Sequence, residues 1–297
     1  MPKTVSTPRA HPIATRTRPS KRRPRWAVSA GVAALILIAL CFTLLAAFGG
    51  APARSTAAST ATIPPTSMTT VLTVDGQGVP VREFELFLAQ DRAETFAYYQ
   101  QHYAVSDQPG FWTTAHGGQT PTVYLKKLAL ADAVHATVQF NLAHTYGLIP
   151  DPGYAAFLDS LTAENKSRAL ALSQHQPIYG PEQYTETTYF TYVLSQTGNR
   201  LQAALVDHKV ISVTDSALLR YYNAHRENYQ EADLNASGTD AGVSGPPTQS
   251  GIAPFAQVKA EVTQDYETTG YNALISRLAA TASVRIDAGV LAAVQIS

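Results

Sequence analysis

VLTVDGQGVPVREFELFLAQDRAETFAYYQQHY, residues 71–103, is the stretch of sequence that decides the fold. It opens with a β-prone run that contains Asp75-Gly76, a turn signal. The apolar residues then recur at i, i+3 and i+4, as Phe84, Phe87 and Leu88 do, which is the spacing of a helix face. We expect a short strand followed by a helix that reaches the end of the stretch.

The same patterns predict further helices and one more strand downstream. Thr120 is a plausible N-cap with Pro121 in the first turn, and Thr214 or Asp215 caps a later helix. Pro181 is expected at the start of another helix. We expect a mainly α fold with two short β-strands. The predicted elements are helices over 120–148, 154–174, 181–208 and 254–281, a short extended lead-in followed by a capped helix within 210–229, and a strand over 282–287.

Composition narrows the class of protein. Apolar residues make up 45% of the 297 residues and charged residues 15%, so the chain is expected to fold rather than remain disordered. The single cysteine, Cys41, excludes a disulfide framework within the chain and any zinc site with several cysteines.

Charge is distributed unevenly along the chain, although the formal net charge is zero. Residues 1–54 carry nine Lys/Arg and no acid, whereas residues 55–297 carry 13 Lys/Arg and all 22 Asp/Glu. Phosphate attraction requires positive charge, so the acidic part is not expected to bind nucleic acid.

A basic tail over 1–25 precedes an uncharged segment over 26–48, WAVSAGVAALILIALCFTLLAAF. As a helix these residues rise about 34 Å, enough to cross a hydrocarbon core of about 30 Å. We therefore expect a single transmembrane signal anchor in the cytoplasmic membrane. Residues 49–70 are rich in Ala, Ser, Thr and Pro and are expected to form a flexible tether.

Basic residues beside an apolar segment favour a cytoplasmic N-terminus, which places the C-terminal part outside the cytoplasm. Two outcomes remain open for the segment. It is either a retained anchor, which its length favours, or a cleaved signal peptide, in which case the rest of the chain is secreted.

The order of elements resembles that of the SurA/PrsA-type extracytoplasmic foldases. VLTVDGQGVPVREFELFL resembles the strand, turn and helix with which the family's chaperone domain begins. ISVTDSALLRYYNAHRENY, from residue 211, is similar to the helix that precedes the parvulin prolyl-isomerase domain in that family. FAQVKAEVTQDYETTGYNALISRLAATASVRI, from residue 255, is similar to the helix and strand that follow it.

The resemblance implies one helical chaperone domain built from both ends of this region, 71–229 and 254–297. It also implies that Val71–Val74 pairs with Val284–Ile286. Only 230–253 lies where the family carries its parvulin domain, and this linker or surface loop is too short for a domain. We therefore expect that the isomerase has been lost and that the protein is not an enzyme.

Motifs for covalent or metal chemistry are not evident. No H-x-x-x-H, H-E-x-x-H, G-x-S-x-G or Walker pattern occurs in the sequence, so we expect no catalytic residue, cofactor or metal. Asp132 and His135 are three residues apart on one predicted helix, where an exposed surface pair is favoured over an acid–base pair.

Aromatic residues are the candidates for a binding site. The functional interpretation is a groove for extended peptide, because Tyr combines apolar area with a polar tip. The alternative is that these side chains pack against neighbouring helices. The candidate peptide-binding residues are Phe111, Trp112, Tyr179, Tyr184, Tyr189 and Tyr192. Glu164, Asn165 and Arg168, at helical spacing, are expected to bridge to a neighbouring helix.

The resemblance to these foldases and the expected loss of the parvulin domain together favour a membrane-anchored chaperone. Such a protein would bind unfolded or exported polypeptides without covalent catalysis. The main alternative is a dedicated interaction subunit of an envelope or secretion complex. A weaker alternative is a peptidyl-prolyl isomerase with a degenerate site. The sequence does not determine the client or the oligomeric state.

Overall fold

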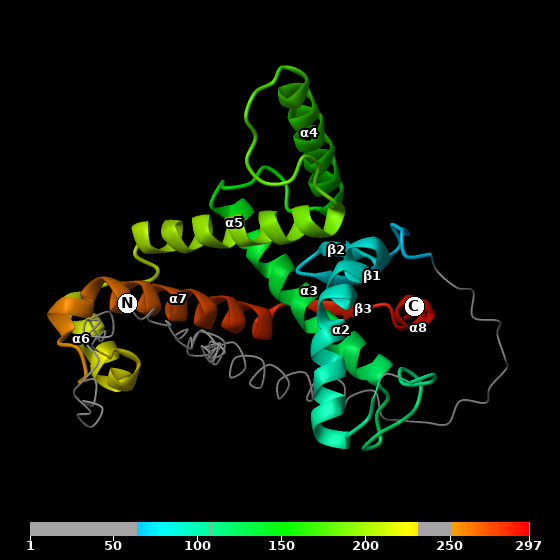
Figure 1. Cartoon of the computed structure of the whole chain (residues 1–297), viewed down its shortest axis with the longest axis horizontal. Helices are drawn as coiled ribbons and strands as arrows, with labels where there is room; N and C mark the ends of the chain where they lie inside the picture. Colours follow the sequence, from blue (N-terminus) through cyan, green and yellow to red (C-terminus); the bar gives the residue numbers. More distant parts are fainter. Residues whose placement is uncertain (1–63, 107, 231–250, 297) are drawn as a thin grey trace, which may run out of the picture. The chain divides into compact units, whose positions relative to one another are not determined.

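The structure, a computed structural model, describes residues 64–106, 108–230 and 251–296 (Figure 1). The chain divides into two units, Met1–Phe48 and Gly49–Ser297. The predicted basic tail and membrane segment lie outside the described residues, as do most of the predicted tether and of the predicted linker over 230–253.

Helices dominate the described part of the second unit, together with one small sheet (Figure 1). The elements in chain order are β1 (Thr70–Val74), β2 (Gln77–Pro80), α2 (Val81–Tyr103), α3 (Pro121–Thr145), α4 (Tyr154–Ser173), α5 (Glu186–Asp207), α6 (Asp215–Ala224), a 3₁₀ turn (Arg226–Asn228), α7 (Phe255–Thr281), β3 (Val284–Ile286) and α8 (Ala288–Ala293).

The predicted fold class is wrong in its strands. The described sheet has three strands in the order β2-β1-β3, not two. Asp75 and Gly76 both adopt positive φ, 51° and 88°, and Val74 pairs with Gln77. This is the two-residue turn that joins antiparallel strands, and Asp-Gly favours it. The turn signal therefore marks a hairpin, whereas we expected it to end a single strand.

The fold class is also corrected for its transmembrane helix. The segment expected to cross the membrane, 26–48, lies outside the described residues. Within the described ranges, no helix combines the length and the apolar character that a bilayer crossing requires. The observed class is a mainly helical fold with a three-stranded antiparallel sheet.

The predicted pairing of the two ends of this region is confirmed. β1 runs antiparallel to β3, with Leu72 opposite Ile286 and Val74 opposite Val284. Beyond the strands, the Asp287 amide donates to the Val71 carbonyl at 2.9 Å and the Asp75 amide to the Ser283 carbonyl at 3.0 Å. Segments more than 200 residues apart in sequence thus close the unit.

Side-chain caps mark the starts of α3, α5 and α6. The predicted N-caps are confirmed at Thr120, which accepts from the Val123 amide, and at Thr214, which accepts from the Ala217 amide. The predicted helix start at Pro181 is wrong. α5 begins at Glu186, because Thr185 and Thr188 form a reciprocal capping box.

The core centres on α3, which packs against α2, α5 and α7. Gln139 of α3 joins two of these helices, since its Nε2 donates to the Leu194 carbonyl of α5 at 2.7 Å and its Oε1 accepts from the Tyr271 hydroxyl of α7 at 2.7 Å. Gly198 of α5 lies beside this junction. A Cβ there would be 3.3 Å from both the Gln139 Oε1 and the Tyr271 hydroxyl, so glycine allows the close approach.

Two contacts fix the ends of the later segments. Lys126 Nζ donates to the carbonyls of Leu291 and Val294, at 2.8 and 2.6 Å, and so holds the end of α8 against α3. Gln230 and Ile252 form an isolated antiparallel bridge, and the Ala253 amide donates to the Tyr229 carbonyl at 2.9 Å. The residues that flank the undescribed segment 231–250 are therefore neighbours.

Leu72→Ala will destabilise the fold strongly, because Leu72 is fully buried in the central strand. Large-to-small changes at such sites cost about 2–5 kcal/mol. Chemical denaturation monitored by circular dichroism measures the loss. Thr73→Ala is the matched control, since Thr73 belongs to the same strand but is half-buried. Equal costs for the two variants would contradict the assignment of β1 as the closing strand.

Candidate functional site

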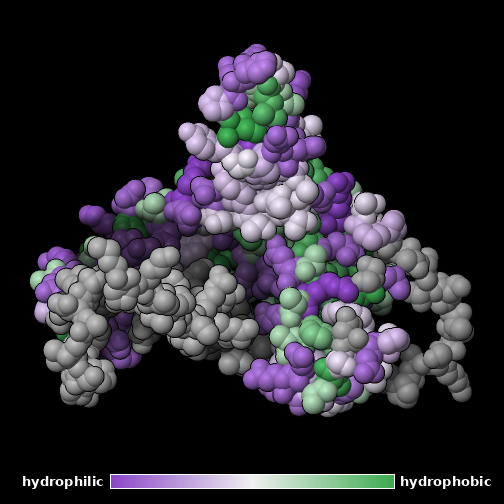
Figure 2. All heavy atoms as spheres, in the orientation of Figure 1, coloured by the Kyte–Doolittle hydropathy of each residue, from purple (hydrophilic) through white to green (hydrophobic). Residues whose placement is uncertain are grey.

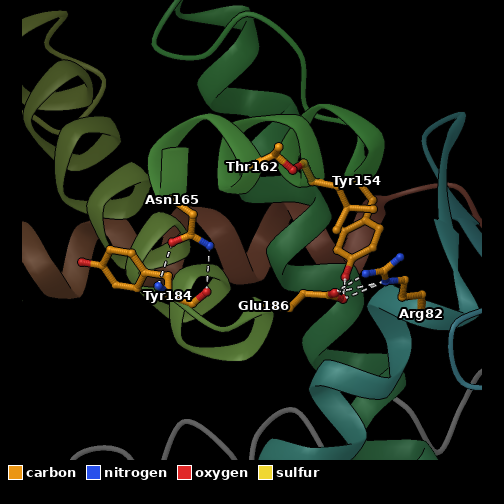
Figure 3. A network of polar contacts seen from close by, with 7 residues as sticks. Arg82, Tyr154, Thr162, Asn165, Tyr184 and Glu186 are labelled. Atoms are coloured by element: carbon orange, nitrogen blue, oxygen red, sulfur yellow. Dashed lines mark hydrogen bonds and ion pairs between the residues drawn. The ribbon is translucent and has the colours of Figure 1, made fainter. Parts of the chain in front are cut away.

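Three helices begin at one polar cluster, formed by Arg82 of α2, Tyr154 of α4 and Glu186 of α5 (Figure 3). Arg82 Nη2 lies 2.6 Å from Glu186 Oε2, and Arg82 Nε lies 3.1 and 3.2 Å from the two carboxylate oxygens. The Tyr154 hydroxyl donates to Glu186 Oε1. Glu186, the first residue of α5, thereby fixes the first turns of α2 and α4.

The protonation states of Glu186 and Tyr154 are fixed around neutral pH. Burial alone raises the pKa of Glu186, but the hydrogen bonds from Arg82 and Tyr154 outweigh it, so the net pKa is lowered. Burial, followed by the bond to Glu186, raises the pKa of the Tyr154 hydroxyl. The carboxylate is therefore charged and the phenol protonated around neutral pH, so no proton moves between them there.

Glu83 follows Arg82 in the first turn of α2 and is only 6% exposed. Burial raises the pKa of its carboxyl to about 8. Such a shift means that the neutral acid predominates around pH 7.

The second feature is a projecting hairpin, residues 154–185, which we call the α4 arm (Figure 1). The segment that returns from α4 is bonded to it at two points. Asn165 Nδ2 donates to the Tyr184 carbonyl at 2.9 Å, and its Oδ1 accepts from the Tyr184 amide at 2.8 Å (Figure 3). Arg168 Nη1 donates to the carbonyls of Tyr179 and Pro181, at 2.9 and 2.7 Å.

Arg168 is itself fixed from both sides. Its Nε lies 2.8 Å from Glu164 Oε1, and its guanidinium lies 4.5 Å from the centre of the Tyr184 ring. The prediction that Glu164, Asn165 and Arg168 bridge to a neighbouring helix is wrong. Asn165 and Arg168 bond instead to the returning segment of their own hairpin, and Glu164 holds Arg168 in place.

The arm contributes little to the core. Tyr154 is its one buried residue within α4, and among the described elements α5 is the main one that α4 packs against. Leu170 is 57% exposed, Leu172 38% and Tyr179 89%. A shallow pocket lies between Arg168 and Ala171 of α4 and the Pro177–Tyr179 segment. The arm thus presents apolar side chains to solvent on a rigid frame.

The structure brings together three of the six candidate peptide-binding residues. The rings of Tyr184, Tyr189 and Tyr192 lie together with centres 5.3–6.2 Å apart, and the Tyr192 ring is stacked with each of the other two. Tyr189 is buried, Tyr184 half-buried and Tyr192 exposed. Tyr179 lies in the same arm, on its returning segment.

Phe111 and Trp112 belong to a different place. Phe111 is buried in an aromatic cluster with Tyr99 of α2 and Tyr124 of α3. Trp112 is half-buried beneath the Arg92 guanidinium, 4.5 Å from the ring centre. The six residues therefore do not form one groove.

Sequence reasoning missed the Arg82–Glu186 pair and the exposure of Leu170 and Leu172. The pair joins residues 104 positions apart, and no local signal links them. An amphipathic pattern predicts an apolar helix face but not whether a neighbour covers it.

Comparisons with protein-family models, with curated proteins and with solved structures find no match for this chain. The resemblance to the SurA/PrsA-type foldases therefore stays an interpretation of the sequence pattern. In the part of the chain that the structure describes, no group of three or more His, Cys, Asp or Glu side chains is arranged to hold a metal ion.

Glu83→Gln will stabilise the protein at alkaline pH. The folded-state pKa of Glu83 is raised to about 8, above an unfolded value of about 4.3. The native state therefore holds the extra proton, and stability falls as pH rises between these values. A neutral amide removes this loss. Thermal melting at about pH 5 and about pH 9 should show a smaller decrease for the variant, whereas an unchanged decrease would exclude a protonated Glu83.

Glu186→Gln will loosen the base of the α4 arm more than it lowers global stability. The variant loses the ion pair with Arg82, and we expect a global cost of about 1 kcal/mol. Hydrogen exchange should rise over 154–173, since local opening reports the lost contact. Asp215→Asn is the control, because the exposed Asp215–Lys259 pair fixes no arm. Equal exchange over 154–173 in both variants would contradict this role for Glu186.

Proposed function

We propose that this protein is a chaperone-like polypeptide-binding protein, which takes up apolar segments of unfolded chains on the α4 arm without a covalent step. Shielding such segments lowers the concentration of species that aggregate. The proposal concerns the described part of the chain. The expected extracytoplasmic location stays a prediction.

One observation carries the proposal: the arm holds apolar side chains in solvent on a frame that its own hydrogen bonds make rigid. On the face seen in Figure 2, an apolar patch lies at the free end of α4 and hydrophilic residues border it. Exposed apolar patches of this kind are typical of interaction sites. A rigid frame also reduces the side-chain ordering that binding would cost.

The stacked tyrosines extend the proposed surface along the base of the arm. Tyr192 is 48% exposed beside Tyr184, so it offers both an apolar ring and a hydroxyl. Such rings suit partners of varied sequence, because they provide large contact area at low entropic cost.

The charge of the α4 arm favours one kind of client polypeptide. The arm, residues 154–185, carries three Asp/Glu and two Lys/Arg, and one of these acids, Glu164, pairs with Arg168. Asp159 and Glu182 are exposed. A surface that is apolar and net negative favours segments that are apolar and basic.

The resemblance to the SurA/PrsA-type foldases is a second support. That resemblance implies a domain closed by strands from its two ends, and the pairing of β1 with β3 agrees with it. The family's chaperone activity is carried over only as part of this proposal.

Substitution of the arm tip will test the proposal. The purified chain should suppress thermal aggregation of a model client at equimolar ratio and in excess. The double variant Leu170→Ser/Leu172→Ser should lose at least half of that suppression, because it removes exposed apolar area without touching the core. Val210→Ser is the control, since Val210 is 50% exposed and lies outside the arm.

Two results would contradict the proposal. Wild-type protein that suppresses no aggregation would leave the arm without a client-binding role and would favour a dedicated partner. Equal loss in the arm variant and in Val210→Ser would show that the arm is not the binding surface. Circular dichroism of each variant confirms that the fold is retained.

A further inference from the structure

Two aspartates face each other between α2 and α3, away from the arm. The two helices pack closely along their length, and Tyr98 of α2 stacks on Tyr124 of α3 with ring centres 4.5 Å apart. Asp91 lies two turns before Tyr98, and Asp132 lies two turns beyond Tyr124. Because the helices run antiparallel, these steps bring the two carboxyls to the same level.

One oxygen of the buried Asp91 carboxyl has no hydrogen-bond donor. Asp91 is 6% exposed, and its Oδ2 has no partner that donates to it. One turn later, the fully buried Thr95 Oγ1 also lacks a partner. A buried carboxylate in this situation is strongly disfavoured, because nothing replaces the water that it loses.

Asp132 supplies the missing partner only when the pair holds a proton. Its side chain lies within hydrogen-bonding reach of Asp91. Two carboxylates accept hydrogen bonds and cannot donate one, whereas a carboxylic acid donates to a carboxylate. Asp132 is exposed, so the proton reaches the pair from solvent without opening the core.

Among the described residues, the further charge that acts on the pair is negative. Glu94 of α2 is the other charged group that acts on both aspartates. β1 and β2 contain no titratable side chain. The charged side chains of α5 and α7, which also pack on α3, are not among the groups that shift either aspartate.

Burial, followed by the charge and hydrogen bond of Asp132, raises the pKa of Asp91 to about 8. Asp132 is exposed as a residue, but partial desolvation of its carboxyl also raises its pKa. Burial lowers the pKa of His135, also on α3, which disfavours the charged form of the ring that could offset this negative charge. The surface pair of Asp132 with His135 considered from the sequence gives way to a pair between Asp132 and Asp91.

We propose that Asp91 and Asp132 form a proton-binding site, in which one shared proton joins α2 to α3. Loss of this proton separates the distal halves of the two helices, which are the C-terminal half of α2 and the N-terminal half of α3. The site is independent of the proposed function of the arm. Release of the proton leaves two adjacent carboxylates, with Glu94 as a third charge nearby, and their repulsion acts between the helices.

Separation of α2 from α3 would affect one aromatic cluster. The cluster of Tyr99, Phe111 and Tyr124 lies between the distal halves of the same two helices. Separation of α2 from α3 would therefore expose aromatic surface that is covered while the proton is bound, and would do so as pH rises.

Carbon-13 NMR of full-length protein labelled at the aspartate carboxyl carbon tests the site directly, since this label excludes Glu83. We expect two aspartate signals that titrate together, one of them near pH 8, whereas ordinary aspartates titrate near about pH 4. Asp132→Asn should lower the pH of the high titration, because it removes the charge of Asp132 and its amide donates to the Asp91 carboxylate, whereas the burial of Asp91 remains. Asp159→Asn, on the exposed side of α4, should leave it unchanged.

The structural consequence is measured by thermal melting against pH in a Glu83→Gln background. Between about pH 5 and about pH 9 the melting temperature should fall, because the native pair binds the extra proton. Asp132→Asn should at least halve that fall, and Asp159→Asn should not change it. Fluorescence of Trp112, in a chain with Trp26→Phe, should change over the same pH range.

Three results would overturn the proposal. Both aspartates titrating near about pH 4 would exclude the shared proton. An Asp132→Asn variant with the same pH dependence as wild type would separate the titration from the helix contact. Calcium or magnesium that shifts both carboxyl signals and raises the melting temperature of wild type, but not of Asp132→Asn, would show that the pair binds a cation instead.

Discussion

The antiparallel pairing of β1 with β3 is the constraint on which the described unit depends. It joins Leu72 to Ile286 across the unit and so holds the last helices beside the first. α3 can then pack against α2 from the N-terminal side and against α7 from the C-terminal side, with Gln139 bonded to α5 and α7. Loop-closure entropy opposes such a distant contact, and burial of the central strand offsets it.

Outside this closed core, the α4 arm is held by specific polar contacts together with the ring of Phe157, which packs against Tyr189 and Phe190 of α5. The α4 arm joins the core through Glu186 and is internally fixed through Asn165 and Arg168. Its apolar residues therefore need not pack for the arm to keep its shape. This separation of frame from surface explains how a helix with a single buried residue keeps its place while its leucines stay exposed.

Local signals allowed much of the fold to be predicted from the sequence. The periodicity that begins at Phe84 predicted α2, and Thr120 and Thr214 predicted the starts of α3 and α6. Asp75-Gly76 was recognised as a turn but not as a hairpin, because β2 is a short strand whose sequence, QGVP, has little β character. The predicted helix start at Pro181 was wrong because the capping box four residues later is the stronger start signal.

Contacts between distant residues could not be predicted in this way. Tyr184, Tyr189 and Tyr192 are close in sequence, on α5 and its lead-in, and their rings are neighbours in the structure. Phe111 and Trp112 depend on how a loop folds onto α2 and α3, which spacing does not encode. The Asp91–Asp132 pair was also invisible, because it requires the register of one helix against another.

The bridge between Gln230 and Ile252 has a consequence for how this fold accommodates change. The two ends of the intervening segment emerge side by side from the contact of α6 with α7. A chain that leaves and re-enters a structure at one point leaves the rest of that structure unaltered, whatever its length. This position is therefore a site where insertions are tolerated. Segments from a short turn to a whole domain could be exchanged here while the closed unit keeps its own stability.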